Sequence, residues 1–178
     1  LMLSNLPILF IPIISFVSFF VLQKLYINNK MIDEINERSS HISIATRSGG
    51  ISIFLTVFLF SCFYYFSGIE IFDFSLIVPL SLLLVVGLYD DIYKIDFKLK
   101  FLFQIIAAKI LIDNGLIIDN LHGVFGVFEV NRILAQGITI FFIVAIINSI
   151  NFIDGIDGLA MSIVIVFISM FEFMSAAE

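Results

Sequence analysis

Polar side chains recur at every third position in one otherwise apolar stretch, NSINFIDGIDGLA, which covers residues 148–160. Two amides, Asn148 and Asn151, are followed by two carboxylates, Asp154 and Asp157. On a helix, a spacing of three residues keeps side chains on one slowly rotating stripe. Four polar groups on one stripe of an apolar segment avoid lipid and turn toward a protein interior or a ligand. The spacing therefore predicts a polar binding surface that includes all four side chains.

A purely structural interpretation of this stretch is a tight turn between two helices, in which a side-chain oxygen of Asp157 caps the second helix. That role accounts for Asp157 alone and leaves both asparagines and Asp154 unexplained. Gly155 and Gly158 let the backbone turn and come close to a ligand. We therefore favour a binding role for the stretch as a whole.

A second acidic group, Asp90 and Asp91, lies in the stretch GLYDDIYKIDFKLK at the end of an apolar run. Adjacent carboxylates repel each other and are tolerated best where a divalent cation or a proton lies between them. The ordinary alternative is a charged stop to a membrane helix, but lysine and arginine are the less costly stops on the cytoplasmic side. The pair therefore favours a functional role over a simple helix end.

Three lysines follow this acidic pair at once: Lys94, Lys98 and Lys100. They can form a positively charged binding site for phosphate groups. They are also the signal that keeps a loop on the cytoplasmic side of a membrane, and that signal accounts for most of them. The two interpretations are compatible, and the sequence does not separate them.

A third candidate group lies in the stretch NERSSHISIATRSGG, where His41 and Arg47 can hold an anion. Gly49 and Gly50 would allow a ligand to approach the backbone closely. An ordinary solvated loop explains these residues as well, because a lone histidine or a glycine pair is a weak signal. Taken alone, this loop predicts no site.

The composition indicates which elements must position these residues. Of the 178 residues, 61% are hydrophobic and 13% are charged, and the mean hydropathy is +1.14. A soluble domain has too much surface to be this apolar, so an integral membrane protein is predicted. The charge pattern contains no basic stripe, which argues against a nucleic-acid partner. The single cysteine, Cys62, cannot form an internal disulfide and is expected to be a packing residue.

About six membrane spans are expected, each a helix of roughly 20 apolar residues. They predict an all-α, polytopic helix bundle that forms one integral membrane domain over residues 1–178. The expected spans are Leu1 to Leu22, Gly49 to Ile69, Phe74 to Tyr89, Phe101 to Ile118, Ile133 to Ile153, and a last span from Gly158. Lys109, inside the fourth span, is expected to pack toward the bundle. The segment from Ile117 to Val130 is expected to form a small hairpin on the outer, periplasmic face.

Lysine and arginine are unevenly distributed among the loops, with four between the first two spans and three between the third and fourth. By the positive-inside rule, both loops face the cytoplasm. The connection from Asp154 to Gly158 follows on the same side. The three candidate groups would then share one membrane face, which is the first argument that they form one site.

Three motifs in this order, NERSSH with TRSGGISIFL, GLYDDIYKIDFKLKFLFQ and NSINFIDGIDGLA, resemble those of the polyprenyl-phosphate N-acetylhexosamine-1-phosphate transferase superfamily. The sequence is similar to its undecaprenyl-phosphate GlcNAc-1-phosphate transferase-like branch, a sister of phospho-N-acetylmuramoyl-pentapeptide transferase. The resemblance covers most of the chain from Asn36 onward. It implies transfer of a sugar 1-phosphate from a UDP-sugar to undecaprenyl phosphate in the bacterial inner membrane, with release of UMP. The product would initiate a cell-envelope glycan of the O-antigen, enterobacterial common antigen or teichoic acid type.

The resemblance also implies roles for individual residues. Asp90, Asp91 and Asp154 are implicated in catalysis. The residues expected to bind substrate are His41, Arg47, Lys94, Lys98, Lys100, Asn148, Asn151 and Asp157. The metal, expected to be Mg²⁺ with Mn²⁺ as an alternative, would be held by Asp90, Asp91, Asp154 and Asp157. A homodimer is left open.

Elementary electrostatics agrees with such a reaction. Both substrates are anionic, so attack of a phosphate oxygen on a diphosphate is repelled unless a hard cation neutralises charge. Carboxylate oxygens suit Mg²⁺, and lysines supply the remaining positive charge. A site at the membrane edge lets a soluble nucleotide meet a lipid whose phosphate lies at the headgroup level.

The sequence departs from the family pattern in two places. Ala45 and Thr46 stand where relatives usually have a proline near the arginine. The last span has 14 uncharged residues before Glu172, fewer than the roughly 20 that a membrane helix needs. Members of the resembled family have about ten spans, whereas about six are expected here. An N-terminal fragment of a longer enzyme is therefore expected.

Three other interpretations fit parts of the pattern. A truncated chain could fold without catalysing any reaction. A transporter that uses intramembrane acids as relays should carry them near the middle of its spans, whereas here they cluster at one face. A CDP-alcohol phosphatidyltransferase would need DG followed by AR and further spaced aspartates, and this chain has DGLAMS.

Overall fold

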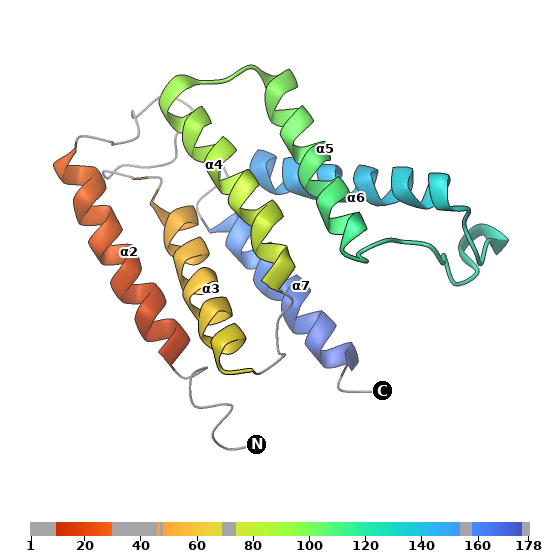
Figure 1. Cartoon of the computed structure of the whole chain (residues 1–178), viewed down its shortest axis with the longest axis horizontal. Coiled ribbons are helices and arrows are strands. Elements are labelled where there is room, and N and C mark those ends of the chain that lie inside the picture. The colour runs from red at the N-terminus through yellow and green to blue at the C-terminus, as the bar shows by residue number, and fades with distance from the viewer. Residues whose placement is uncertain (1–9, 30–45, 47, 69–73, 154–157, 176–178) are drawn as a thin grey trace.

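The structure, a computed structural model, describes residues 10–29, 46, 48–68, 74–153 and 158–175. Within these ranges the chain forms six α-helices, two short 3-10 turns and no regular strand (Figure 1). The helices are α2 (Ile11–Asn28), α3 (Gly49–Phe66), α4 (Ile77–Tyr93), α5 (Phe97–Asp113), α6 (Arg132–Ile153) and α7 (Leu159–Ser175). The 3-10 turns are η2 (Phe74–Leu76) and η3 (Val124–Gly126). The predicted all-α membrane helix bundle is confirmed.

Three of these helices are long and apolar enough to cross a membrane: α2 and α3 with 18 residues each, and α6 with 22. A further apolar helix, α7, has 17 residues. A helix closes its backbone hydrogen bonds internally, which the hydrocarbon core of a bilayer requires. Helix length and composition thus agree on a membrane protein.

Some helices extend past the charged residues at which their apolar runs stop. α2 continues beyond Gln23 and Lys24, and α4 continues beyond the Asp90–Asp91 pair. α5 lies about one turn earlier than the expected fourth span, whereas α6 agrees with the expected fifth span to within one residue. A charged side chain ends an apolar run, but helical backbone hydrogen bonds continue into the membrane interface. Both carboxylates therefore stand on the last turn of α4.

Most buried residues of the bundle are small or polar. Ala107, Ala108 and Ala135 are fully buried, whereas many large side chains point outward, with Phe141 68% and Phe167 70% exposed. Small residues let helix backbones approach closely, and lipid surrounds the large apolar side chains. This distribution is typical of helices that pack within a membrane.

Consecutive helices pack against one another: α2 on α3, α3 on α4, α4 on α5, and α5 on α6. In Figure 1, α2 ends, α3 begins, α4 ends and α5 begins at the upper end of the bundle. We call this end the Asp90 end, because Asp90 lies on the last turn of α4. The two connections that are rich in lysine and arginine therefore join helix ends that lie on one side of the bundle.

The segment between α5 and α6 forms a short hairpin. Asn120 and Glu129 make an antiparallel bridge, and the backbone N–H of Leu121 donates a hydrogen bond to the carbonyl oxygen of Phe128 at 2.8 Å. The turn η3 closes the hairpin, and Gly123 before it has a φ of 86°, which glycine adopts without strain. The predicted hairpin is confirmed, and its periplasmic location stays a prediction.

Candidate active site

Asp90 shapes the end of α4. The helix ends with Lys94 in the left-handed region (φ 49°, ψ 68°), and the Lys94 N–H donates to the carbonyl oxygen of Asp90 at 2.8 Å. The next N–H, that of Ile95, donates to Oδ1 of Asp90 at 3.1 Å. A left-handed residue with such bonds is a common helix end, because it satisfies carbonyl groups that have no partner in the next turn. The Asp90 carboxylate is therefore held in place by its own turn.

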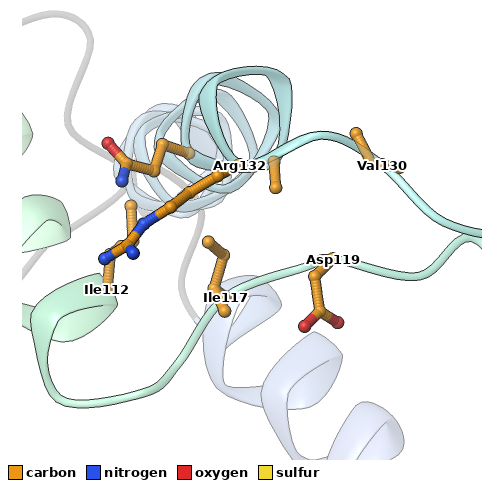
Figure 2. Close-up of a pocket in the computed structure, with 7 residues that line it drawn as sticks. Ile112, Ile117, Asp119, Val130 and Arg132 are labelled. Atoms are coloured by element: carbon orange, nitrogen blue, oxygen red, sulfur yellow. The ribbon is translucent and has the colours of Figure 1, made fainter.

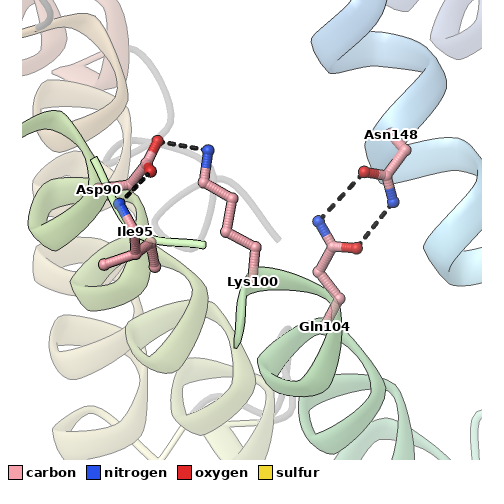
Figure 3. A network of polar contacts seen from close by, with 5 residues as sticks. All are labelled: Asp90, Ile95, Lys100, Gln104 and Asn148. Carbon is pink, nitrogen blue, oxygen red and sulfur yellow. Dashed lines mark hydrogen bonds and ion pairs between the residues drawn. The ribbon is translucent and has the colours of Figure 1, made fainter. Parts of the chain in front are cut away.

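An ion pair joins this carboxylate to the next helix. Lys100 lies in the first turn of α5, and its Nζ contacts Oδ2 of Asp90 (Figure 3). The Asp90 side chain is 21% exposed and the Lys100 side chain is 31% exposed. One oxygen of Asp90 thus accepts from the backbone and the other from Lys100. The structure brings together one predicted acid and one predicted base, from two different helices.

Three further predicted residues, Asp91, Lys94 and Lys98, lie exposed at the junction of α4 and α5. Asp91 interacts electrostatically with the phenol of Tyr26, near the C-terminal end of α2. A tyrosine near a helix end is a typical membrane-interface residue, but its spacing gives no sign of a distant acid. Tyr26 is therefore a neighbour of the site that sequence patterns did not reveal.

Asn148, predicted to bind substrate, forms a reciprocal amide pair with Gln104. Asn148 Nδ2 donates to Oε1 of Gln104 at 2.7 Å, and Gln104 Nε2 donates to Oδ1 of Asn148 at 3.5 Å (Figure 3). Gln104 is 8% exposed and joins α5 to α6. Its only sequence signal was its place at the end of the second motif.

The remaining predicted residues belong, by their sequence positions, to the end of α6, the connection to α7 and the first loop. Asn151 lies exposed on the last turn of α6. Gly158, with a φ of 75°, precedes α7 in the left-handed region, which agrees with the predicted turn at that glycine. Four predicted residues lie outside the described part of the chain: His41, Arg47, Asp154 and Asp157.

The described residues contain no group of three or more His, Cys, Asp or Glu side chains that could hold a metal ion. Two of the four predicted ligands, Asp90 and Asp91, are described, and the other two lie outside the described ranges. Carboxylate oxygens are the ligands that Mg²⁺ prefers, and a carboxylate has about four lone-pair sites. The hydrogen bond from Ile95 and the contact with Lys100 leave Asp90 with capacity for a further partner. The donor chemistry of the acidic pair therefore fits a magnesium ion.

A cavity of about 340 Å³ lies at the opposite end of α5 from Lys100 (Figure 2). Its walls come from the end of α5, the hairpin and the start of α6. They consist of Ile112, Ile117, Asp119, Val130, Arg132, Ala135 and Gln136. Its charged residues, Arg132 and Asp119, point in different directions (Figure 2). None of the predicted site residues lines this cavity, so it is separate from the Asp90 end.

The sequence of residues 73–178 matches the family model described as Glycosyl transferase family 4. A Bacillus subtilis protein named "Probable undecaprenyl-phosphate N-acetylglucosaminyl 1-phosphate transferase" is 31% identical over 87% of this chain and 43% of its own length. A Yersinia pestis protein named undecaprenyl-phosphate alpha-N-acetylglucosaminyl 1-phosphate transferase is 31% identical over 89% of this chain and 44% of its own. A Mycolicibacterium smegmatis decaprenyl-phosphate N-acetylglucosaminephosphotransferase is 30% identical over 70% and 33%.

The chain thus spans less than half the length of these curated relatives. No solved structure matches it significantly. The matched region contains the acidic pair, the three lysines and the Asn148–Asp157 stripe, whereas the predicted residues His41 and Arg47 precede it.

Proposed function

Because this chain belongs to glycosyl transferase family 4, we propose that it takes part in transferring an N-acetylhexosamine 1-phosphate from a UDP-sugar to undecaprenyl phosphate. UMP is the second product. The names of the Bacillus and Yersinia relatives support both the lipid acceptor and the sugar class. The lipid-linked product would initiate a cell-envelope glycan of the O-antigen type.

The observation that carries the proposal is the Asp90–Lys100 ion pair, which links the end of α4 to the start of α5. It holds a carboxylate and an ammonium group at a membrane-helix end, beside a second carboxylate and two exposed lysines. Opposite charges in this arrangement suit two phosphorylated substrates, because cations offset phosphate charge and acids hold a metal or a proton. A relay acid of a transporter would instead be expected in the middle of a span.

In the proposed reaction, a phosphate oxygen of the lipid attacks the β-phosphorus of the UDP-sugar. A new P–O bond forms to the lipid phosphate, and the bond between the β-phosphorus and the bridging oxygen breaks, so that UMP leaves with both electrons of that bond. Lys94, Lys98 and Lys100 offset the charge of the two anions and hold them in line. The contacts from Ile95 and Lys100 orient the Asp90 carboxylate toward this group of charges.

A magnesium ion, when bound, would neutralise charge on the diphosphate and on the departing UMP. Asp90 and Asp91 would hold it together with Asp154 and Asp157. The oxygen-rich donor set of the acidic pair supports this assignment.

The Asp90 end faces the cytoplasm of the bacterial inner membrane in this proposal. The support is the concentration of lysine and arginine in the connections at that end. A soluble nucleotide sugar and the phosphate of a membrane lipid can meet only at such an interface.

The test uses the full-length protein in purified membranes with undecaprenyl phosphate, Mg²⁺ and a panel of UDP-N-acetylhexosamines. We expect release of UMP together with a lipid-linked sugar diphosphate, and loss of both products when the lipid is omitted or the metal is chelated. UDP-glucose, which lacks the acetamido group, serves as the matched substrate control. If no UDP-sugar gives UMP in the presence of lipid and Mg²⁺, the proposal is wrong.

A further inference from the structure

A buried amide side chain, Gln104, lies between the two acidic motifs and was assigned no role by the sequence. It is 8% exposed and projects from α5 to Asn148 on α6, a residue 44 positions away along the chain. A buried amide in an apolar bundle needs hydrogen-bond partners, and Gln104 finds Asn148 for its carbonyl oxygen and for one of its N–H donors. The residue therefore contributes an interhelical contact that lipid or an apolar neighbour cannot replace.

The side chain of Asn148 makes several hydrogen bonds inside the bundle. Its Nδ2 has two protons, and it donates to Oε1 of Gln104 at 2.7 Å and to the carbonyl oxygen of Val144 at 2.8 Å. Its Oδ1 accepts from Gln104 at 3.5 Å. Both donors are thus used inside the bundle, and the oxygen has one long contact. The amide N–H groups of Asn148 are therefore not available to a substrate, and they connect α6 to α5.

The position of Gln104 connects this pair to the Asp90 end. Lys100 and Gln104 lie four residues apart on α5, so they project from adjacent turns of one helix. Lys100 reaches Asp90 on α4, and Gln104 reaches Asn148 on α6 (Figure 3). Two consecutive turns of α5 therefore tie the acidic pair of α4 to the helix that leads into the Asp154 connection.

We propose that Gln104 is a positioning residue, which holds the C-terminal end of α6 in register with α5 through Asn148 and so fixes how the last turn of α6, with Asn151, lies relative to the Asp90 end. It touches neither substrate, and it acts through Asn148 and α6. A single buried polar pair can specify helix register because any other register leaves both amides unsatisfied. This inference rests on the proposed phosphosugar transfer.

The experiment is a double-mutant cycle on UMP release by the full-length protein. Gln104→Leu and Asn148→Leu should each lower kcat on the order of 10-fold, as for the loss of a group that supports a site. KM for both substrates should change little. The double variant should be no slower than either single variant, since both remove the same contact. The swapped pair, Gln104→Asn with Asn148→Gln, should recover most of the lost kcat.

Thr139→Val is the matched control. Thr139 is a buried polar residue nearer the other end of α6, where it accepts from the N–H of Ile118 at 2.9 Å and donates to the carbonyl oxygen of Ala135 at 2.7 Å. Its loss should lower thermal stability in detergent without changing kcat per folded molecule. If the Gln104 and Asn148 variants behave in this way too, their role is structural only and the proposal is overturned.

Two further outcomes are informative. Fully additive losses in the double variant, or no recovery in the swapped pair, would also overturn the positioning role. If the leucine variants do not accumulate, the swapped pair and Gln104→Glu provide the test. The swapped pair should keep most of the kcat of the unmodified protein, and Gln104→Glu, which keeps an acceptor for Asn148, should lower kcat by less than about 10-fold. An unmodified protein that releases no UMP contradicts the proposed function, whereas an active protein with unaffected variants contradicts only this inference.

Discussion

The two ends of α5 each carry a lysine–aspartate ion pair. One pair joins two helices, and the other joins two residues of the same helix. Lys100, in the first turn, pairs with Asp90 on the neighbouring helix α4. Lys109, in the last turns, pairs with Asp113 of its own helix, four residues along. The Lys109 side chain is 44% exposed and that of Lys100 is 31% exposed. The same two residue types therefore build an interhelical connection at one end and a local surface pair at the other.

This difference shows which charges organise the bundle. An exposed pair within one helix contributes only about 0.3–0.5 kcal/mol. A contact between helices, by contrast, restricts how they are placed relative to each other. The interpretation that Lys109 packs toward the bundle was wrong. Its ammonium group extends to Asp113 near the end of the helix, as long basic side chains do when they reach for a polar partner.

The largest expected effect comes from removing the charge of the acidic pair. Asp90→Asn keeps an oxygen that can accept from the Ile95 N–H, so the turn survives while the charge and the ion pair are lost. We expect kcat/KM for UMP release to fall by on the order of 100-fold or more, and the same for Asp91→Asn. The matched control is Asp113→Asn, which removes the acid of the other pair and should leave the rate nearly unchanged. Near-normal turnover of Asp90→Asn at saturating Mg²⁺ would refute its catalytic role.

A smaller effect should separate the two lysines. Lys100→Gln removes the interhelical contact and one cation near the phosphates, so we expect kcat/KM to fall on the order of 10-fold. Lys109→Gln should change it by less than about twofold, because that pair joins two residues of one helix whose side chains are 44% and 60% exposed. The measurement is kcat/KM for UMP release by each variant, in membranes prepared in the same way. Equal losses would mean that the contrast between the two ends of α5 has no functional meaning.

The smallest expected effect concerns the backbone at Lys94, which lies in the left-handed region without being glycine. Lys94→Gly should raise the free energy of unfolding by about 0.5–1 kcal/mol, because glycine adopts this conformation without strain. Lys94→Ala removes the same charge but keeps the strain, and it should not stabilise the protein. Thermal unfolding in mild detergent compares the two variants. If UMP release falls equally in both, the lysine charge matters for the reaction, and a rise in stability only with glycine confirms the strain.

Most of the fold could be predicted, and the site only in part. The apolar runs predicted α6 almost to the residue, because this helix is apolar over nearly its whole length. The ends of α2 and α4 were misplaced, since hydropathy reports where lipid contact stops and the helix itself goes on. The motifs identified Asp90 and Lys100 as candidates, but not as partners, and they did not assign a role to Gln104 or Tyr26.

The sequence by itself determined that this protein lies in a membrane and to which family it belongs. Its apolar composition requires a membrane, its lysine and arginine pattern distinguishes the loops, and its motifs indicate the family, because each of these signals is local and survives without a structure. The partners of the polar side chains were decided only by tertiary structure. Asp90 with Lys100, and Gln104 with Asn148, come together because α5 packs between α4 and α6. Such pairs depend on the rotation and register of whole helices, which no spacing within one helix can specify.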